Sequence, residues 1–465
     1  TWCDHVIDFL TCAQTVWSFC HSCNAQANSQ KKRQNKKLGD KKRIAVGAGA
    51  EKAKGRIMGG ISTTTTGGGR RVESSGMSAS APFGSAKRPE ELLSLSFNQD
   101  SGCFACGTDG GFRIYNCDPF KETFRRRFDS GGIGQVEMLF RCNILALVGG
   151  GRSPRYSPNK VMIWDDHQSR CIGELSFRVE VRAVRLRRDR VVVVLEHKIY
   201  VYNFADLKIL HQTDTVANPL GLCALSPTQD STVMACPGLN KGQVRVELYD
   251  LGVTKFISAH DGELAQLQLT LDGALLATAS EKGTLIRVYD TATATLMHEF
   301  RRGADRATVY SIAFAPGKDF LAVSSDKGTV HVYVVPERAS VGGRGGGGAA
   351  GGGADGVPNP AEGSDQEGGV IDAKAAFSFV KGFLPKYFSS EWSLAQFKLP
   401  DFTRSLVAFG PEPNTLIVVT VEGTYYKVGF DPKSGGACAQ VAFARFLKTA
   451  EEEEEGGWGA VRDVR

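Results

Sequence analysis

The 465-residue sequence lacks the features that mark several common classes of protein. No apolar run reaches the ~18 residues that a membrane-spanning helix needs. The first residues, Thr1-Trp2-Cys3, offer neither a basic segment nor a clean cleavage site, so they do not resemble a secretory signal peptide. The 12 cysteines are not combined with histidine pairs at zinc-ligand spacing. Buried reduced thiols are therefore the favoured interpretation, and a zinc site is the weaker alternative.

Enzyme signatures are also missing. The sequence shows no converging carboxylate pair, no Ser-His-Asp order with a nucleophile elbow, and no metal-ligand spacing, so we expect a non-enzymatic protein without a cofactor. The net charge of +6 comes from residues 31–43, where eight Lys or Arg residues stand against one Asp. The rest of the chain is near neutral, and any anion binding there requires a local cluster of basic residues.

The composition divides the chain into segments. Residues 1–88 are basic and then rich in Gly, Ala, Ser and Thr, which favours disorder. Their basic run fits a solvated tail, a nuclear signal or a contact with an acidic surface. Residues 336–395 form an insertion that is first rich in Gly and Ala and then in aromatic residues and lysine. Residues 447–465 form an acidic tail, which we expect to be solvated.

Between residues 89 and 446, short β-branched and aromatic runs alternate with turn residues, and no long amphipathic helix interrupts them. A turn followed by a strand with an aromatic end recurs, at intervals of 38 to 49 residues over its first six copies. This is the period of four-stranded propeller blades. The sequence therefore predicts an all-β, seven-bladed, WD40-like β-propeller, closed without a strand borrowed from the N-terminus. The aromatic ends are Tyr115, Trp164, Tyr202, Tyr249, Tyr289, Tyr333 and Tyr426.

The motif Phe300-Arg301-Arg302-Gly303 ends a strand-like run in the fifth repeat. Successive side chains of an extended chain leave on opposite faces, so the two arginines can serve two neighbouring pockets. Guanidinium groups suit phosphate oxygens. Similar segments flank the motif: Ser280-Glu281-Lys282-Gly283-Thr284 precedes it and Ser325-Asp326-Lys327-Gly328-Thr329 follows it, each with a basic residue on the next strand. Each segment alone fits an ordinary hairpin turn, and their joint occurrence around the arginine pair favours two phosphate sites.

These residues carry a resemblance to a known family. The stretch from about 92 to 445, with its intact Phe-Arg-Arg-Gly motif, resembles the PROPPINs, which include the WIPI and autophagy-related protein 18 propellers. Residues 139–151, 159–177 and 324–333 also look like that family. The resemblance does not cover residues 1–88, the Gly-rich linker or the acidic tail.

The resemblance implies a phosphoinositide-binding peripheral membrane scaffold in autophagy. Its ligands would be phosphatidylinositol 3-phosphate and phosphatidylinositol 3,5-bisphosphate, with one head group at each of two sites. It further implies a lipid-transfer partner of the autophagy-related protein 2 type, no nucleic-acid partner, and a cytoplasmic location on preautophagosomal, endosomal or vacuolar membranes. A generic WD-repeat interaction scaffold without lipid binding is the alternative function.

The resemblance also assigns site residues in this sequence. The first phosphoinositide site would use His260, Ser280, Lys282, Thr284, Arg287 and Arg301. The second would use Arg302, Ser324, Ser325, Lys327, Thr329 and His331. Part of the insertion would enter the bilayer, through Phe379, Phe383, Leu384, Tyr387, Phe388 and Trp392. Aromatic residues mixed with lysine suit the membrane interface, although the same residues could instead pack on the side of the propeller.

Overall fold

The computed structural model describes residues 90–128, 131–336, 391–447 and 462–463. All described residues belong to one compact unit, which begins at Glu90. These residues form strands and turns without a helix. Accordingly, the described part of the chain offers no helix able to cross a membrane. The expectations for residues 1–88 lie outside the described residues.

The strands build seven sheets, or blades, each with four antiparallel strands, and three blades carry a fifth strand. Blade 1 consists of β1 (Leu92–Phe97), β2 (Cys103–Thr108), β3 (Gly111–Asn116) and β4 (Lys121–Arg127), and blade 2 of β5 (Ile133–Met138), β6 (Ile144–Gly149), β7 (Lys160–Asp165) and β8 (Arg170–Ser176). Blade 3 consists of β9 (Ala183–Leu186), β10 (Arg190–Val194), β11 (Lys198–Asn203) and β12 (Ile209–Asp214), and blade 4 of β13 (Ala224–Leu225), β14 (Val233–Pro237), β15 (Gln243–Leu248) and β16 (Val253–Ser258).

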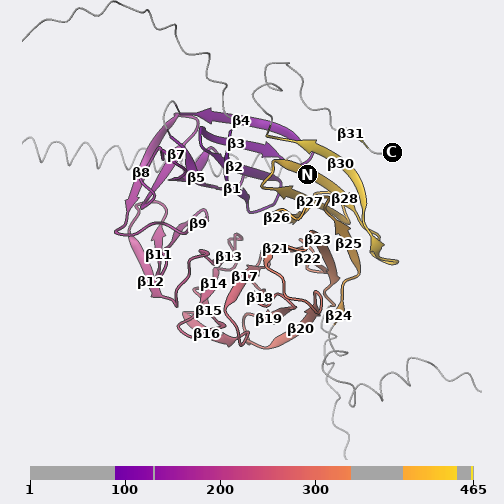
Figure 1. Ribbon diagram of the computed structural model, residues 1–465. Helices are drawn as coiled ribbons and strands as arrows, with labels where there is room; N and C mark the ends of the chain where they lie inside the picture. Colours follow the sequence, from indigo (N-terminus) through magenta and orange to yellow (C-terminus); the bar gives the residue numbers. More distant parts are fainter. Residues whose placement is uncertain (1–89, 129–130, 337–390, 448–461, 464–465) are drawn as a thin grey trace, which may run out of the picture. The chain divides into compact units, whose positions relative to one another are not determined.

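Blades 5 to 7 are those with a fifth strand. Blade 5 consists of β17 (Leu264–Leu269), β18 (Leu275–Ser280), β19 (Leu285–Asp290), β20 (Leu296–Arg301) and β24 (Glu391–Trp392). Blade 6 consists of β21 (Val309–Phe314), β22 (Phe320–Ser325), β23 (Thr329–Val334), β25 (Ala395–Lys398) and β29 (Gly436–Ala437). Blade 7 consists of β26 (Ser405–Phe409), β27 (Thr415–Thr420), β28 (Thr424–Gly429), β30 (Ala439–Arg445) and β31 (Arg462–Asp463). The predicted seven-bladed β-propeller is confirmed, and Figure 1 shows its blades arranged in a ring.

Burial explains why each blade has this strand pattern. The second and third strands of a blade are covered on both faces by the neighbouring blades, so their sequences are almost continuously apolar, as in β10 with Val191–Val194 fully buried. The fourth strand lies at the outer edge, and β12 exposes Ile209 and Leu210 there. Apolar clusters join successive blades: Ile286 and Phe300 of blade 5 pack with Tyr333 of blade 6.

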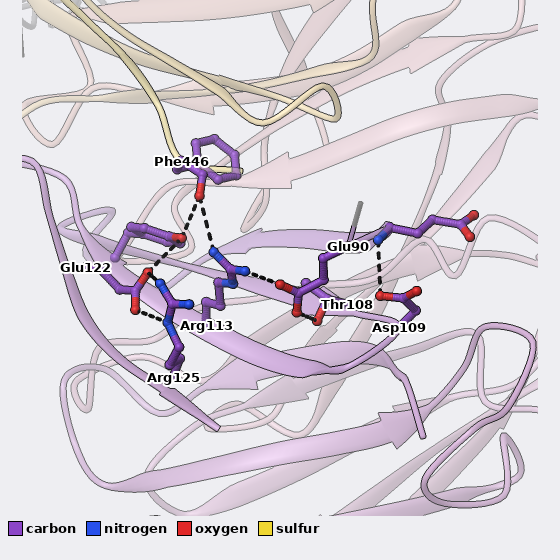
Figure 2. A network of polar contacts seen from close by, with 9 residues as sticks. Glu90, Thr108, Asp109, Arg113, Glu122, Arg125 and Phe446 are labelled. Atoms are coloured by element: carbon purple, nitrogen blue, oxygen red, sulfur yellow. Dashed lines mark hydrogen bonds and ion pairs between the residues drawn. The ribbon is translucent and has the colours of Figure 1, made fainter. Parts of the chain in front are cut away.

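Among the described residues, blades 1 and 7 share no strand, and side-chain contacts join them. Phe104 of blade 1 packs in one cluster with Tyr425 of blade 7 and with Phe446, which follows that blade's β30. The Phe446 carbonyl accepts hydrogen bonds from Tyr115 Oη at 2.9 Å and from Arg113 Nη1 at 3.5 Å. Figure 2 shows this network, in which the buried Arg113 also pairs with Glu90.

A second polar bridge crosses the same junction. Tyr425 Oη donates to the Cys117 carbonyl at 2.7 Å, and Lys427 Nζ lies 2.7 Å from Asp118 Oδ2. These partners are about 310 residues apart in the chain and on neighbouring blades in space. Closure therefore depends on contacts between the two ends of the repeat series.

The cysteines are mostly unpaired in the described structure. Seven carry free thiols, and Cys103, Cys106, Cys117, Cys223 and Cys236 among them are buried. Burial raises the pKa of the Cys223 thiol to about 12, so it is protonated and unreactive at neutral pH. Cys142 is disulfide-bonded, so the expectation of reduced thiols is wrong for this residue.

Candidate anion-binding sites

Arg301 and Arg302 lie at the end of β20 and diverge into two different spaces. Phe300, opposite Ile286 in β19, is fully buried toward blade 6, with its ring centroid 5.0 Å from that of Tyr333. Because side chains alternate along a strand, Arg301 leaves from the opposite face of blade 5. Arg302 returns to the blade 6 side, where its charge acts on His331. The structure thus gives the adjacent arginines two separate surroundings.

The first group of residues lies on the blade 5 face that carries Arg301. Arg287 stands opposite Thr278 on one side and Glu299 on the other. Its Nη1 donates to the Ala259 carbonyl at 2.6 Å, and its Nε to Glu299 Oε2 at 2.9 Å. His260 Nε2 lies 2.9 Å from the hydroxyl oxygen of Thr278. Thr278 and the segment Ala259–His260 therefore bring the predicted His260 and Arg287 together.

The predicted Ser280 is part of the same face, since it follows Thr278 by two residues in β18. It is buried, whereas Lys282 is exposed and Thr284 half-buried in the turn that follows. This β18–β19 turn also supports the second group. The Gly283 carbonyl accepts a hydrogen bond from Arg302 Nε at 2.6 Å, and the Thr284 carbonyl accepts one from the Arg302 amide at 2.9 Å.

Gly283 is required in this turn. Its φ is +60°, and a Cβ at this position would lie 1.8 Å from the Ala307 carbonyl oxygen. Ala307 in turn donates its amide to the Lys282 carbonyl at 3.1 Å. The turn of blade 5 is thereby fixed against the segment that leads into blade 6.

The second group lies on the blade 6 face that points to blade 5. His331 stands opposite Val323 in β22 and Gln396 in β25, and Thr329 lies two residues before it on the same face. Lys327 is exposed in the β22–β23 turn. Arg302, buried at 7% exposure, also binds the Asp305 carbonyl through Nη2. Arg302, Thr329 and His331 thus belong to one surrounding, with Lys327 in the adjoining turn.

The two predicted serines of blade 6 differ. Ser324 faces the other way: its hydroxyl donates to the Ser405 carbonyl of blade 7 at 2.8 Å, and the residue is fully buried. The structure does not bring its side chain to the second group. Ser325 lies two residues after Val323 in β22, so its side chain is on the face of blade 6 that points to blade 5. Its buried hydroxyl makes no hydrogen bond to the described residues. Ser325, rather than Ser324, belongs with His331.

The segments Ser280–Thr284 and Ser325–Thr329, which look equivalent in the sequence, differ by one residue in the length of their turns. Four residues separate β18 from β19, but three separate β22 from β23. Thr284 therefore lies in a turn, whereas Thr329 begins a strand and has Leu285 as its counterpart. Arg287 and His331 nevertheless occupy equivalent positions, each two residues into the third strand of its blade.

Both predicted histidines are neutral in this structure at pH 7. Burial, reinforced by the charge of Arg287, lowers the pKa of His260 to about 4, against opposing effects of the hydrogen bond with Thr278 and of the Glu299 and Asp261 charges. Burial and the charge of Arg302 lower the pKa of His331 to about 4. An unperturbed imidazole titrates near ~6.5. Desolvation and the adjacent guanidinium both disfavour the imidazolium, so both pKa values lie below this.

Several residues of these sites carry no signal in the sequence. Ser393 Oγ lies 3.2 Å from His331 Nδ1, and Gln396 Nε2 donates to the same hydroxyl at 3.0 Å. Ser393 lies near the end of the insertion and Gln396 directly after it, far along the chain from His331 of blade 6. Glu299 and Thr278 looked like ordinary strand residues, and only the pairing of β18, β19 and β20 shows that they flank Arg287.

Of the predicted membrane-inserting residues, only Trp392 falls within the described part of the chain. It lies in β24, opposite Arg301 in parallel pairing, and is 54% exposed. The insertion therefore returns to the propeller beside the arginine motif. The remaining calls lie outside the described residues: Phe379, Phe383, Leu384, Tyr387 and Phe388.

Comparison with known proteins identifies the family. The PROPPIN family model matches residues 91–342, which is more than half of the chain. The chain belongs to the PROPPIN family. It is 39% identical over 375 residues to the autophagy-related protein 18e of Arabidopsis thaliana, covering 80% of this chain and 92% of that protein. It is 35% identical over 397 residues to the autophagy-related protein 18 of Yarrowia lipolytica, covering 77% of this chain and 97% of that protein. These relatives support a role of this PROPPIN in autophagy.

Solved structures agree on the fold. The Hsv2 structure of Kluyveromyces lactis matches with a TM-score of 0.58 at 23% identity, covering 77% of this chain and 99% of that one. A complex of the Kluyveromyces lactis Atg21 protein with the coiled coil of Atg16 matches with a TM-score of 0.58, also at 23% identity, with 77% and 99% coverage. At this identity the likeness establishes the propeller fold of the PROPPIN. Within its described residues, no group of three or more His, Cys, Asp or Glu side chains could hold a metal ion.

Proposed function

We propose that this PROPPIN binds phosphatidylinositol 3-phosphate and phosphatidylinositol 3,5-bisphosphate and acts as a peripheral membrane scaffold in autophagy. One observation carries the proposal: adjacent arginines leave β20 on opposite faces, and each meets a separate set of basic and hydroxyl residues. The first head group is bound between blades 4 and 5, and the second between blades 5 and 6. Anion recognition follows from the residue types, and the identity of the lipid follows from the family.

Phosphate suits both sets of residues for a chemical reason. A phosphate group presents several oxygens that accept hydrogen bonds, and guanidinium groups offer matching forks of donors. The first set supplies Arg287, Arg301 and Lys282, and the second supplies Arg302 and Lys327. The neutral imidazoles of His260 and His331 each carry one N–H, so each can donate without adding charge.

The insertion provides the proposed contact with the membrane. Its return strand, β24, places the exposed Trp392 next to Arg301 in the sheet. Aromatic side chains favour the bilayer interface. Once one head-group site or the inserted segment holds the protein on a membrane, the effective concentration of lipid for the other contacts rises. The loss of one contact therefore weakens membrane binding as a whole. The protein would reside in the cytoplasm and gather on preautophagosomal, endosomal or vacuolar membranes.

The proposed protein partner is a lipid-transfer protein of the autophagy-related protein 2 type, which the bound PROPPIN would recruit to the growing membrane. The alternative is a WD-repeat scaffold that binds proteins without lipid. Protein binding alone gives no reason for the arginine pair and its two surroundings, so the lipid-binding function is favoured.

The first test is flotation with phosphatidylcholine vesicles that contain phosphatidylinositol, phosphatidylinositol 3-phosphate or phosphatidylinositol 3,5-bisphosphate. We expect the pair of changes Arg301→Thr and Arg302→Thr to lower vesicle binding about tenfold or more. Arg302 also holds two backbone carbonyls, so circular dichroism and a melting curve must accompany this variant. Unchanged binding of a folded variant would refute lipid recognition by this motif.

A milder variant separates binding from folding. Lys282→Gln with Lys327→Gln removes two exposed lysines from the turns of both sites, where a loss of fold is not expected. Lys160→Gln with Lys208→Gln is the matched control, because it removes the same charge from blades 2 and 3. We expect weaker flotation for the first pair and near wild-type flotation for the second. Equal effects of both pairs would indicate general electrostatic attraction and not a site.

A further inference from the structure

The fourth strands of blades 5 and 6 place different charges at equivalent positions. In blade 5, Glu299 of β20 pairs with Arg287, and in blade 6, Gln396 of β25 pairs with His331. Two residues further along these strands, Arg301 of β20 corresponds to Lys398 of β25. Both strands thus present a basic residue at their end, but only blade 5 adds a carboxylate beside it.

The carboxylate of Glu299 is directly engaged with a cation of the first site. Its Oε2 lies 2.9 Å from Arg287 Nε, and both side chains are about one quarter exposed to solvent. Arg287 keeps a second anchor in the Ala259 carbonyl, 2.6 Å from Nη1. The guanidinium is therefore held in place by a neutral acceptor and neutralised by an acidic one.

The amide of Gln396 occupies the corresponding place without charge. It donates to Ser393 Oγ, which also contacts His331 Nδ1. Besides burial, Arg287 disfavours the charged form of His260, whereas Glu299 and Asp261 favour it, so carboxylates as well as an arginine act on the imidazole of the first site. The charge that acts on His331 is that of Arg302. The two sites are alike in layout and unlike in local charge.

We propose that Glu299 competes with the phosphate for Arg287, so that the first site binds a head group more weakly than the second and fills after it. Gln396 puts no such competitor at the equivalent position of the second site. This inference rests on the proposed function and adds to it an order of occupancy, set by one residue in each fourth strand.

Elementary electrostatics gives the size of the effect. A phosphate that approaches Arg287 also approaches a negative charge only a few ångströms further on. For partly exposed groups at that separation, one unit charge changes affinity on the order of tenfold in ordinary salt. We therefore expect Glu299→Gln to tighten the first site about tenfold, and Gln396→Glu to weaken the second by a similar factor.

The test follows each site separately in the full chain. The probe is inositol 1,3-bisphosphate, the soluble head group of phosphatidylinositol 3-phosphate. Histidine side-chain NMR signals report each site, and spectra of His260→Gln and His331→Gln assign them. Wild type, Glu299→Gln and Gln396→Glu are titrated alongside Glu174→Gln, which removes a carboxylate on blade 2 that pairs with Lys160. Because the charge change equals that of Glu299→Gln, this last variant controls for the field of the whole protein.

The expected result is that the His331 signal of the wild type saturates at lower probe concentration than the His260 signal. Glu299→Gln should move only the His260 curve to lower concentration, and Gln396→Glu only the His331 curve to higher concentration. A tightening of the same size in Glu174→Gln, or coincident wild-type curves that neither substitution separates, would overturn the proposal while leaving lipid binding intact. Absence of binding to any variant or to the wild type would instead overturn the proposed function, and this inference with it.

Discussion

The two neutral histidines make stability depend on pH in a predictable direction. His260 and His331 have pKa values of about 4 in the folded protein, against ~6.5 in an unfolded chain. Between these values the unfolded chain binds more protons, so the free energy of unfolding falls as the pH falls. The contribution of each histidine is fully present above pH ~6.5 and is lost progressively toward pH ~4.

The size of the loss follows from the same two values. From about pH 7 to about pH 4.5, each imidazole should cost on the order of 2 to 3 kcal/mol of stability, or about 5 kcal/mol for the pair. Burial and the charge of Arg287 lower the pKa of His260, whereas Glu299 and Asp261 oppose this shift. Burial and the charge of Arg302 lower the pKa of His331. Carboxylates elsewhere also respond to acid, but they respond equally in a variant that changes only the histidines.

The measurement is urea denaturation at both pH values for the wild type and for a variant with His260→Gln and His331→Gln. Glutamine does not titrate, so we expect the variant to lose about 5 kcal/mol less than the wild type between the two conditions. NMR titration of the two imidazoles gives their pKa values independently. Equal pH dependence of the two proteins, together with imidazoles that titrate near ~6.5, would refute the reasoning from burial and adjacent arginine.

Two further predictions concern the turns and the serines of the sites. Gly283→Ala should destabilise the protein by several kcal/mol and weaken both sites, because the new Cβ meets the Ala307 carbonyl. The control Gly252→Ala, at φ +62° with open space around the new Cβ, should cost only about 1 kcal/mol. Equal melting temperatures of the two variants would contradict this prediction. Ser325→Ala should weaken head-group binding at the second site, whereas Ser324→Ala should lower stability by about 1 kcal/mol and leave head-group binding unchanged. Calorimetric titration of both variants with inositol 1,3-bisphosphate measures the binding. Weaker binding in Ser324→Ala and unchanged binding in Ser325→Ala would assign Ser324 to the site.

Much of the fold was predictable because its signals are local and repeated. The strand-like run predicted to end at the Phe-Arg-Arg-Gly motif is β20, Leu296–Arg301. The aromatic strand ends mark the first six blades at intervals of 38 to 49 residues. The contacts that close the ring were not predictable in detail, since Arg113, Tyr115 and Phe446 meet only after all seven blades have formed.

The sequence by itself determined that the chain is a propeller and that two adjacent arginines must point in two directions. These conclusions need only the repeat period and the alternation of side chains along a strand. Only the tertiary structure decided which residues share a face. It turned Ser324 toward blade 7, placed Thr284 in a turn, set Glu299 against Arg287 and brought Ser393 to His331. The physical reason is register: a single extra residue in a turn, or a pairing between distant strands, decides what each side chain meets.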